Sequence, residues 1–149
     1  MPKESDGVFI DANVLVYSTF DDFEREKHVQ CTESLNKMAR SGRALFVSTQ
    51  VLREFFATAT NGTIFKKPLT PKQATRQMRD FLKLFSLVHE KETTLPILMD
   101  LLDKYAVSRQ KIHDMNIVAT MIDNGIFEIL TFNVKDFQQI SEISLHSFE

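Results

Sequence analysis

The stretch Val8-Phe9-Ile10-Asp11 defines the fold class of this sequence. Its three apolar residues follow one another without alternation, which is typical of a strand buried on both faces of a parallel sheet. Leu45-Phe46-Val47 is a second run of this kind, and residues 127–131 predict a further strand. Residues 143–145 are a candidate for one more strand. These short runs predict a small sheet at the centre of the protein.

The segments between the strands have helical periodicity. Helices are predicted over residues 23–40, 49–59, 71–85, 94–105 and 112–124. Thr70, Pro71 and Gln73 form the pattern of a capping box at the start of the third helix. Short strands that alternate with helices imply parallel strands joined by helical crossovers. We therefore expect an α/β protein, a three-layer α/β/α sandwich with a small, mainly parallel sheet of four or five strands.

The composition is that of an ordinary globular protein, because 43% of the residues are hydrophobic and 26% are charged. A length of 149 residues predicts a single domain that spans 1–149. Cys31 is the one cysteine, which excludes a disulfide within the chain and argues against a cysteine-based zinc site. On the apolar stripe of its helix, Cys31 is expected to be buried beside a core histidine, His28. The net charge of −2 shows no overall preference for nucleic acids.

The first seven residues are polar and lack the basic and apolar regions of a signal peptide. No apolar stretch approaches the roughly 20 residues that span a bilayer. We therefore expect a cytoplasmic protein without a membrane partner.

Three acidic residues occupy positions where a strand meets a helix. Asp11 directly follows the first strand, and Asp114 falls in the middle of the apolar face of its helix. Glu54 lies at the border of an apolar stripe one turn after the second strand. Each has an ordinary structural alternative, since Asp11 or Asp114 can cap a helix and Glu54 can be a solvated surface residue. A carboxylate that faces a sheet is costly unless it is paired, capped or bound to a metal.

Asn133 and Asp136 follow the strand that ends at Thr131. They are either turn residues or part of a polar rim shared with Asp11 and Asp114. Carboxylates gathered in one cleft repel each other, and a hard divalent cation removes that conflict. Because the predicted cluster has no His or Cys ligands, it favours Mg²⁺ or Mn²⁺ over zinc.

Four segments carry a resemblance to a known family. They are Val8-Phe9-Ile10-Asp11-Ala12-Asn13-Val14-Leu15, Ser48-Thr49-Gln50-Val51-Leu52-Arg53-Glu54-Phe55, Ile112-His113-Asp114-Met115-Asn116-Ile117-Val118-Ala119-Thr120-Met121 and Leu130-Thr131-Phe132-Asn133-Val134-Lys135-Asp136-Phe137. In this order and spacing, the chain resembles a PIN-domain ribonuclease, most of all the VapC-type toxins of bacterial toxin–antitoxin modules.

The resemblance implies that Asp11, Glu54 and Asp114 are the acidic triad of a metal-dependent endoribonuclease. It implies that Asn13 and Thr131 order the site by hydrogen bonds. Asn133 stands where the family often has a fourth acid, so we expect one tightly held metal, with a second recruited alongside RNA. We assign Asn133 and Asp136 to supporting positions around the acids. The resemblance also implies a homodimer and an antitoxin that inserts a segment into the acidic cleft.

Positive charge is concentrated in one segment. Residues 66–83 contain six basic residues and one acid. Four of the basic residues share one helix face and are candidates for RNA binding, namely Lys72, Arg76, Arg79 and Lys83. The same stripe is also compatible with a solvated helix face or with a docking site for a partner.

Two other classes of protein fit part of the pattern. A phosphoryl-transfer domain of the haloacid-dehalogenase or receiver type also places an Asp after its first strand. The sequence lacks the second Asp of the former class and the strand-ending Lys of the latter. The other class is a PIN-like fold used only to bind RNA or protein, which the Asn at position 133 keeps open.

Overall fold

The computed structural model describes residues 7–148. Five strands form its sheet, namely β1 (Val8–Ile10), β2 (Leu45–Ser48), β3 (Ser86–Val88), β4 (Glu128–Leu130) and β5 (Ser144–Leu145). Their order is β3-β2-β1-β4-β5, and every neighbouring pair is parallel. Because all strands run in one direction, their carboxyl ends meet at one edge of the sheet.

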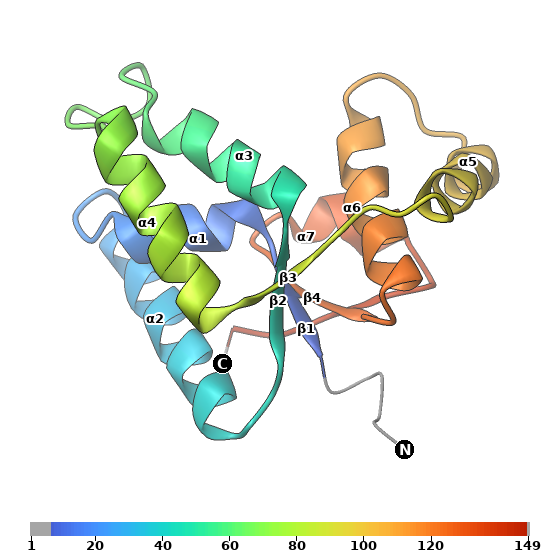
Figure 1. The fold of residues 1–149 in the computed structure, drawn as a ribbon, viewed down its shortest axis with the longest axis horizontal. Coiled ribbons are helices and arrows are strands. Elements are labelled where there is room, and N and C mark those ends of the chain that lie inside the picture. The colour runs from blue at the N-terminus through green and yellow to red at the C-terminus, as the bar shows by residue number, and fades with distance from the viewer. Residues whose placement is uncertain (1–6, 149) are drawn as a thin grey trace.

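Seven helices cover the two faces of this sheet. They are α1 (Ala12–Thr19), α2 (Arg25–Arg40), α3 (Thr49–Ala59), α4 (Pro71–Leu84), α5 (Thr94–Tyr105), α6 (Lys111–Asp123) and α7 (Val134–Phe137). Figure 1 shows α1 to α4 on one side of the sheet and α5 and α6 on the other. The predicted three-layer α/β/α sandwich is confirmed, and its sheet is entirely parallel.

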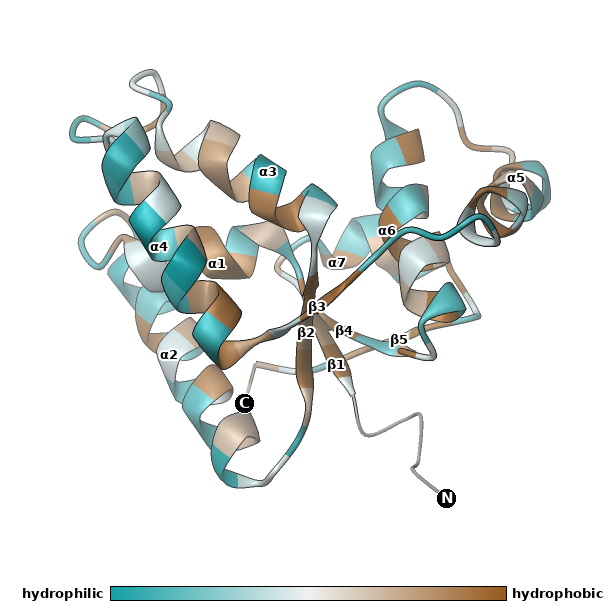
Figure 2. Cartoon of the chain, in the orientation of Figure 1, coloured by the Kyte–Doolittle hydropathy of each residue, from teal (hydrophilic) through white to brown (hydrophobic). Residues whose placement is uncertain are grey.

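The central strand, β1, shows why uninterrupted apolar runs predicted buried strands. Val8, Phe9 and Ile10 are fully buried, with β2 and β4 on either side and helices on both faces. In Figure 2 the ribbon of β1, β2 and β3 is largely brown, whereas α2 and α4 alternate between polar and apolar residues. Burial of apolar surface on both faces of the sheet is therefore the main contribution to its stability.

Local signals placed the helix ends correctly. The capping box is present, because Thr70 Oγ1 accepts from the Gln73 backbone N–H at 3.1 Å and Gln73 Oε1 accepts from the Thr70 N–H at 2.9 Å. Gly42 and Gly125, which follow the ends of α2 and α6, have positive φ angles of 78° and 70°. This left-handed conformation is the one that glycine adopts at little cost.

Strand β3 was missed by the sequence analysis. Its apolar residues, Leu87 and Val88, directly follow the stripe of Phe81 and Phe85 on α4 and continue its hydrophobic character. With three residues at the edge of the sheet, β3 has no periodicity of its own.

The stripe of α2 was expected to bury Cys31 beside a core histidine. Cys31 is fully buried, and this burial raises the pKa of its thiol to about 12, so the thiol stays protonated at neutral pH. Next to it on the stripe, His28 is partly buried and its Nδ1 lies 2.9 Å from the Tyr17 carbonyl oxygen. The predicted burial of Cys31 is confirmed, whereas His28 has a hydrogen-bond partner but is only partly buried.

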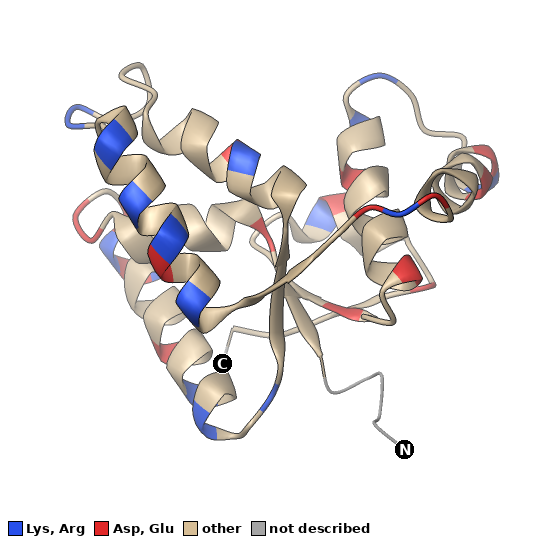
Figure 3. Cartoon of the chain, viewed as in Figure 1, with Lys and Arg blue, Asp and Glu red and all other residues tan. Residues whose placement is uncertain are grey.

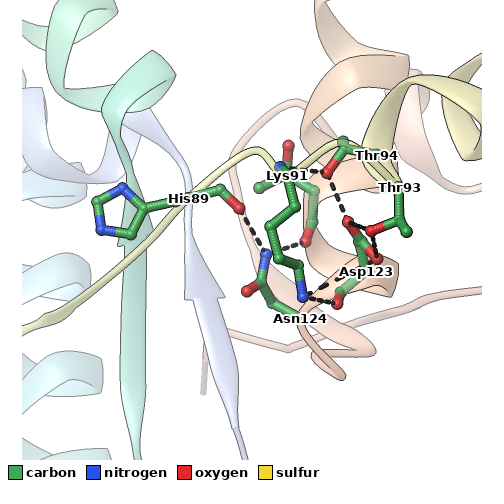
Figure 4. Close-up of polar contacts among 7 residues, drawn as sticks. His89, Lys91, Thr93, Thr94, Asp123 and Asn124 are labelled. Atoms are coloured by element: carbon green, nitrogen blue, oxygen red, sulfur yellow. Dashed lines mark hydrogen bonds and ion pairs between the residues drawn. The ribbon is translucent and has the colours of Figure 1, made fainter.

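A polar clasp holds the end of α6 against the segment that follows β3 (Figure 4). Thr93 and Thr94 donate hydroxyl hydrogen bonds to the carboxylate of Asp123 at 2.6 to 2.8 Å, and they lower its pKa. Asn124 Nδ2 donates to the carbonyl oxygen of His89 at 3.0 Å. The clasp restrains the helix that carries Asp114 at its other end.

No helix within residues 7–148 combines the length and the apolar character needed to cross a bilayer. The prediction that the chain lacks a signal peptide concerns mainly residues 1–6, which lie outside the described residues.

Candidate active site

Asp11 lies at the carboxyl end of the central strand and is only 5% exposed. Its Oδ1 accepts from the Ala12 backbone N–H at 2.8 Å, so the residue is the N-cap of α1 as well as a candidate ligand. Its Oδ2 accepts from Thr131 Oγ1 at 2.7 Å and from Asn13 Nδ2 at 3.2 Å. Three donors from two segments therefore hold this carboxylate in one orientation.

Thr131 connects the end of β4 to the start of α1. Its hydroxyl donates to Asp11 and accepts from Asn13 Nδ2 at 3.1 Å and from the Asn133 backbone N–H at 3.0 Å. Asn13 Oδ1 in turn accepts from the Phe132 N–H at 3.1 Å. Both polar residues predicted to order the site contact Asp11, whereas Asn133 is exposed and joins the network through its backbone.

Asp114 lies in the first turn of α6, which begins at Lys111. The alternative in which Asp114 is the N-cap of this helix is wrong, because the N-cap is Gln110. Lys111 Nζ is 3.7 Å from Asp114 Oδ2 and 2.8 Å from Asp136 Oδ1. One ammonium group therefore bridges an acid of the predicted triad and the acid of α7.

Glu54 is partly buried on α3 and is held from the side by Gln50. Gln50 Nε2 donates to Glu54 Oε2 at 2.9 Å and to the His113 carbonyl oxygen at 2.9 Å. Asn116 Nδ2 donates to Gln50 Oε1 at 2.8 Å. Through this chain of hydrogen bonds α3 and α6 are joined across the site, and Glu54 is not a freely solvated residue.

The acids share one electrostatic environment. Burial raises the pKa of Asp11, and the charge of Glu54 adds to this effect while the hydrogen bonds oppose it. Burial also raises the pKa of Asp114, and the charges of Asp136 and Asp11 raise it further. Carboxylates from four segments therefore lie close enough for their charges to repel one another.

A metal ion at these acids would need several oxygen ligands within coordination distance of one point. Within residues 7–148, no three Asp, Glu, His or Cys side chains converge closely enough to hold one ion together. Mg²⁺ needs fewer protein ligands, because it is usually bound by one or two carboxylates and keeps several waters. Asp11 and Asp114 supply hard oxygen donors, and their pKa values are raised first by burial and further by the charges of neighbouring acids. The donor set fits a hard divalent cation.

The basic stripe is separate from the acids. Its four members are exposed on α4, namely Lys72, Arg76, Arg79 and Lys83. Figure 3 shows basic residues following one another along α4, on the side of the sheet opposite α6. Lys83 Nζ is 3.5 Å from Asp80 Oδ1. The stripe can contact an extended ligand but does not line the acidic site.

The residues predicted for the site did not include Gln50, Asn116 or Lys111. A glutamine in the first turn of an apolar helix, which here is buried, was the available signal for Gln50. A lysine three residues before Asp114 was the signal for Lys111, since residues at this spacing are neighbours on a helix. The partners of Gln50 are 63 and 66 positions away along the chain, so its role depends on the fold.

Comparisons with known proteins bear on the family and the fold of the chain. The PIN domain family model matches residues 8–143. No curated protein sequence matches the chain. The fold is similar to VapBC2 from Rickettsia felis bound to a promoter DNA fragment, with a TM-score of 0.69 and 17% identity over 94% of this chain and 97% of that chain.

Two further structures share the fold. FitAcB from Neisseria gonorrhoeae has a TM-score of 0.68 and 14% identity over 95% of this chain and 97% of that one. The toxin VapC20 from Mycobacterium tuberculosis, described as cleaving the sarcin–ricin loop, has a TM-score of 0.64 and 12% identity over 89% and 95%. With the family model covering nearly all of the described strands and helices, the chain belongs to the PIN-domain family.

Proposed function

We propose that this protein is a divalent-metal-dependent endoribonuclease and the toxin of a toxin–antitoxin pair. One observation carries the proposal, namely that the buried Asp11 carboxylate, held by three hydrogen bonds at the carboxyl end of β1, lies near enough to Glu54 and Asp114 on other elements for their charges to interact. Carboxylates with raised pKa values at the carboxyl edge of a parallel sheet are typical of catalytic sites. Membership of the PIN-domain family supports the same chemistry.

Each residue of the site has a role in this proposal. Asp11 and Asp114 hold Mg²⁺ or Mn²⁺, which when bound orients the scissile phosphate, stabilises its charge and lowers the pKa of a water molecule. Thr131 and Asn13 favour the ionised form of the Asp11 carboxylate and orient it. Glu54, held by Gln50, positions the attacking water.

Lys111 has a different task in the same scheme. Its ammonium group reduces the repulsion between Asp114 and Asp136 in the metal-free protein. Asp136 therefore supports the site by holding Lys111, and Asn133 contributes its backbone N–H to Thr131.

The toxin assignment is supported by the structures of similar fold. They include VapBC and FitAB complexes bound to DNA, and a toxin described as cleaving the sarcin–ricin loop. By analogy we propose that this chain acts in the cytoplasm, forms a homodimer and is bound by a cognate antitoxin.

The geometry argues against a phosphoryl-transfer domain. In such a domain Asp11 would have to attack a phosphorus atom. Here both of its carboxylate oxygens accept hydrogen bonds, and the residue is almost completely buried. An orienting role at the base of a metal site fits these contacts better than nucleophilic attack.

A cleavage assay on a panel of structured RNAs tests the nuclease proposal. We expect Mg²⁺-dependent cleavage that EDTA abolishes and that falls more than about 100-fold in Asp114→Asn and Asp11→Asn. Asp100→Asn, at an exposed position on α5, is the matched control and should cleave at the wild-type rate. Wild-type cleavage by Asp11→Asn would show that the activity does not come from this site.

A further inference from the structure

A groove runs from the acidic site along α1. It starts in a hollow of ≈ 270 Å³ lined by Asn13, Tyr17, Phe23 and Ile64, among others. Phe23 and Ile64 also line an adjoining hollow of ≈ 460 Å³ that reaches Lys66. Because Asn13 Nδ2 is 3.2 Å from Asp11 Oδ2, the groove begins directly beside the proposed catalytic acids. We call it the aromatic groove.

The aromatic residues of the groove contact one another ring to ring. Phe20 and Phe65 stack with their centroids 3.8 Å apart and an angle of 6° between the rings. Phe23 meets Phe65 edge to face at 4.7 Å and stacks with Tyr17 at 6.3 Å. Phe23 is nevertheless 43% exposed and Ile64 44% exposed. Fixed apolar groups thus remain open to solvent, where they offer a surface for a planar ligand.

The charge at the far end of the groove is positive. Lys66 and Lys67 are both exposed, and no carboxylate of the described residues lies within ion-pair distance of either. Asp22 is the acidic residue that lines the same hollow. Lys27 Nζ lies 4.9 Å from the centre of the Tyr17 ring and pairs with Glu24 at 3.3 Å.

We propose that the aromatic groove binds unpaired bases of a single-stranded RNA segment that flanks the cleaved phosphodiester. Exposed rings and unpaired lysines are the combination by which proteins bind single strands, since the rings stack on bases while the cations contact phosphates. Continuity with Asn13 leads the bound strand to Asp11. The inference rests on the proposed nuclease function and adds a subsite on this chain that holds bases next to the cleaved bond.

Binding of a labelled RNA tests the proposal without relying on turnover. The Asp114→Asn protein prevents cleavage in Mg²⁺, and fluorescence anisotropy measures its affinity for an unstructured oligonucleotide and for an abasic version with the same phosphates. Adding Phe23→Leu should weaken binding of the intact RNA about tenfold, whereas Phe23→Trp should preserve it. The abasic RNA should bind weakly and respond little to either change. Leu84→Ala, which alters an exposed apolar residue on α4, is the matched control.

A second variant keeps the test decisive if Phe23→Leu does not fold. Lys66→Ala with Lys67→Ala changes exposed side chains, should weaken binding of both RNAs, and should reduce the salt dependence of binding by a slope of up to about 2. Unchanged affinity in both the Phe23→Leu and the lysine variants would overturn the proposal. Equal binding of the abasic and intact RNAs would also overturn it. If the variants lose binding to a co-purified antitoxin while their RNA affinity is unchanged, the groove binds a protein and the proposal is wrong.

The two proposals fail in different ways. If the protein with Asp114 intact cleaves no RNA in Mg²⁺, the nuclease function is wrong. The binding measurements then still show whether the aromatic groove binds RNA. If cleavage is normal and Phe23→Leu changes neither affinity nor KM, the groove is wrong and the nuclease function stands.

Discussion

Replacing Thr131 with valine keeps the shape of the side chain and removes its hydroxyl group. That hydroxyl is almost completely buried, donates to Asp11 at 2.7 Å, and accepts from Asn13 and from the Asn133 backbone. The variant therefore leaves the buried carboxylate with one donor fewer and two N–H groups without their acceptor. Because it fills the same volume, no cavity forms, and the measured change reports the hydrogen bonds.

The expected loss can be estimated from these contacts. A hydrogen bond to an ionised group contributes about 1.5–3 kcal/mol, and the two partly buried donors add about 0.5 kcal/mol each because water can replace their acceptor. Thr131→Val should therefore lower the free energy of unfolding by about 2–4 kcal/mol. For a chain of this size that corresponds to a fall of about 5–15 °C in Tm.

Thr120→Val is the matched control. Thr120 is as deeply buried as Thr131, but its hydroxyl makes one hydrogen bond, to the Asn116 carbonyl of its own helix at 2.8 Å. This substitution should cost under about 1 kcal/mol. Urea unfolding of both variants measures the difference, and equal losses in the two would refute the assigned role of Thr131.

The effect should also depend on pH. The hydrogen bond from Thr131 lowers the pKa of Asp11 against the larger effect of burial, so its loss raises that pKa further. An acid whose pKa is higher in the folded than in the unfolded state loses stability as pH rises above its unfolded pKa of about 3.9. The extra loss in Thr131→Val should therefore be larger at about pH 7 than at about pH 4.

Three further changes test other parts of the site. Asp114→Asn should raise the Tm of the metal-free protein at about pH 7 and leave it unchanged at about pH 4, because the pKa of Asp114 is raised by burial and by neighbouring acids. Calorimetric scans with and without Mg²⁺ measure both effects, and the variant should lose the rise in Tm that Mg²⁺ causes in the wild type. Gln50→Leu removes the hydrogen bond to Glu54 and should lower kcat about 10-fold or more with KM little changed. Cleavage kinetics measure both constants, and an unchanged kcat would argue against the role of the hydrogen bonds through Gln50. Arg76→Glu with Arg79→Glu should weaken RNA binding and flatten its salt dependence, whereas Mg²⁺ binding measured by calorimetry should stay the same. If the variant binds RNA as tightly as the wild type, the stripe is a solvated helix face.

The prediction of the site from sequence was strongest where a residue is placed by its own neighbours. Asp11 follows an apolar strand and caps the next helix, so its position could be inferred from four adjacent residues. Asp114 was recognised because it interrupts an apolar face, although its relation to Lys111 was not foreseen. Glu54 could not be separated from a surface residue, because Gln50 orients it through contacts with a helix far along the chain.

Short-range patterns were sufficient for the strands β1 and β2, the capping box at Thr70 and the glycine ends of two helices, since each depends on steric and hydrogen-bonding preferences within a few residues. The meeting of the acids depended instead on the strand order β3-β2-β1-β4-β5, which brings the ends of β1, β2 and β4 to one edge. Hydrophobic burial selects that order over the whole chain. Long-range contacts alone then settle which amide, hydroxyl or ammonium group faces each carboxylate.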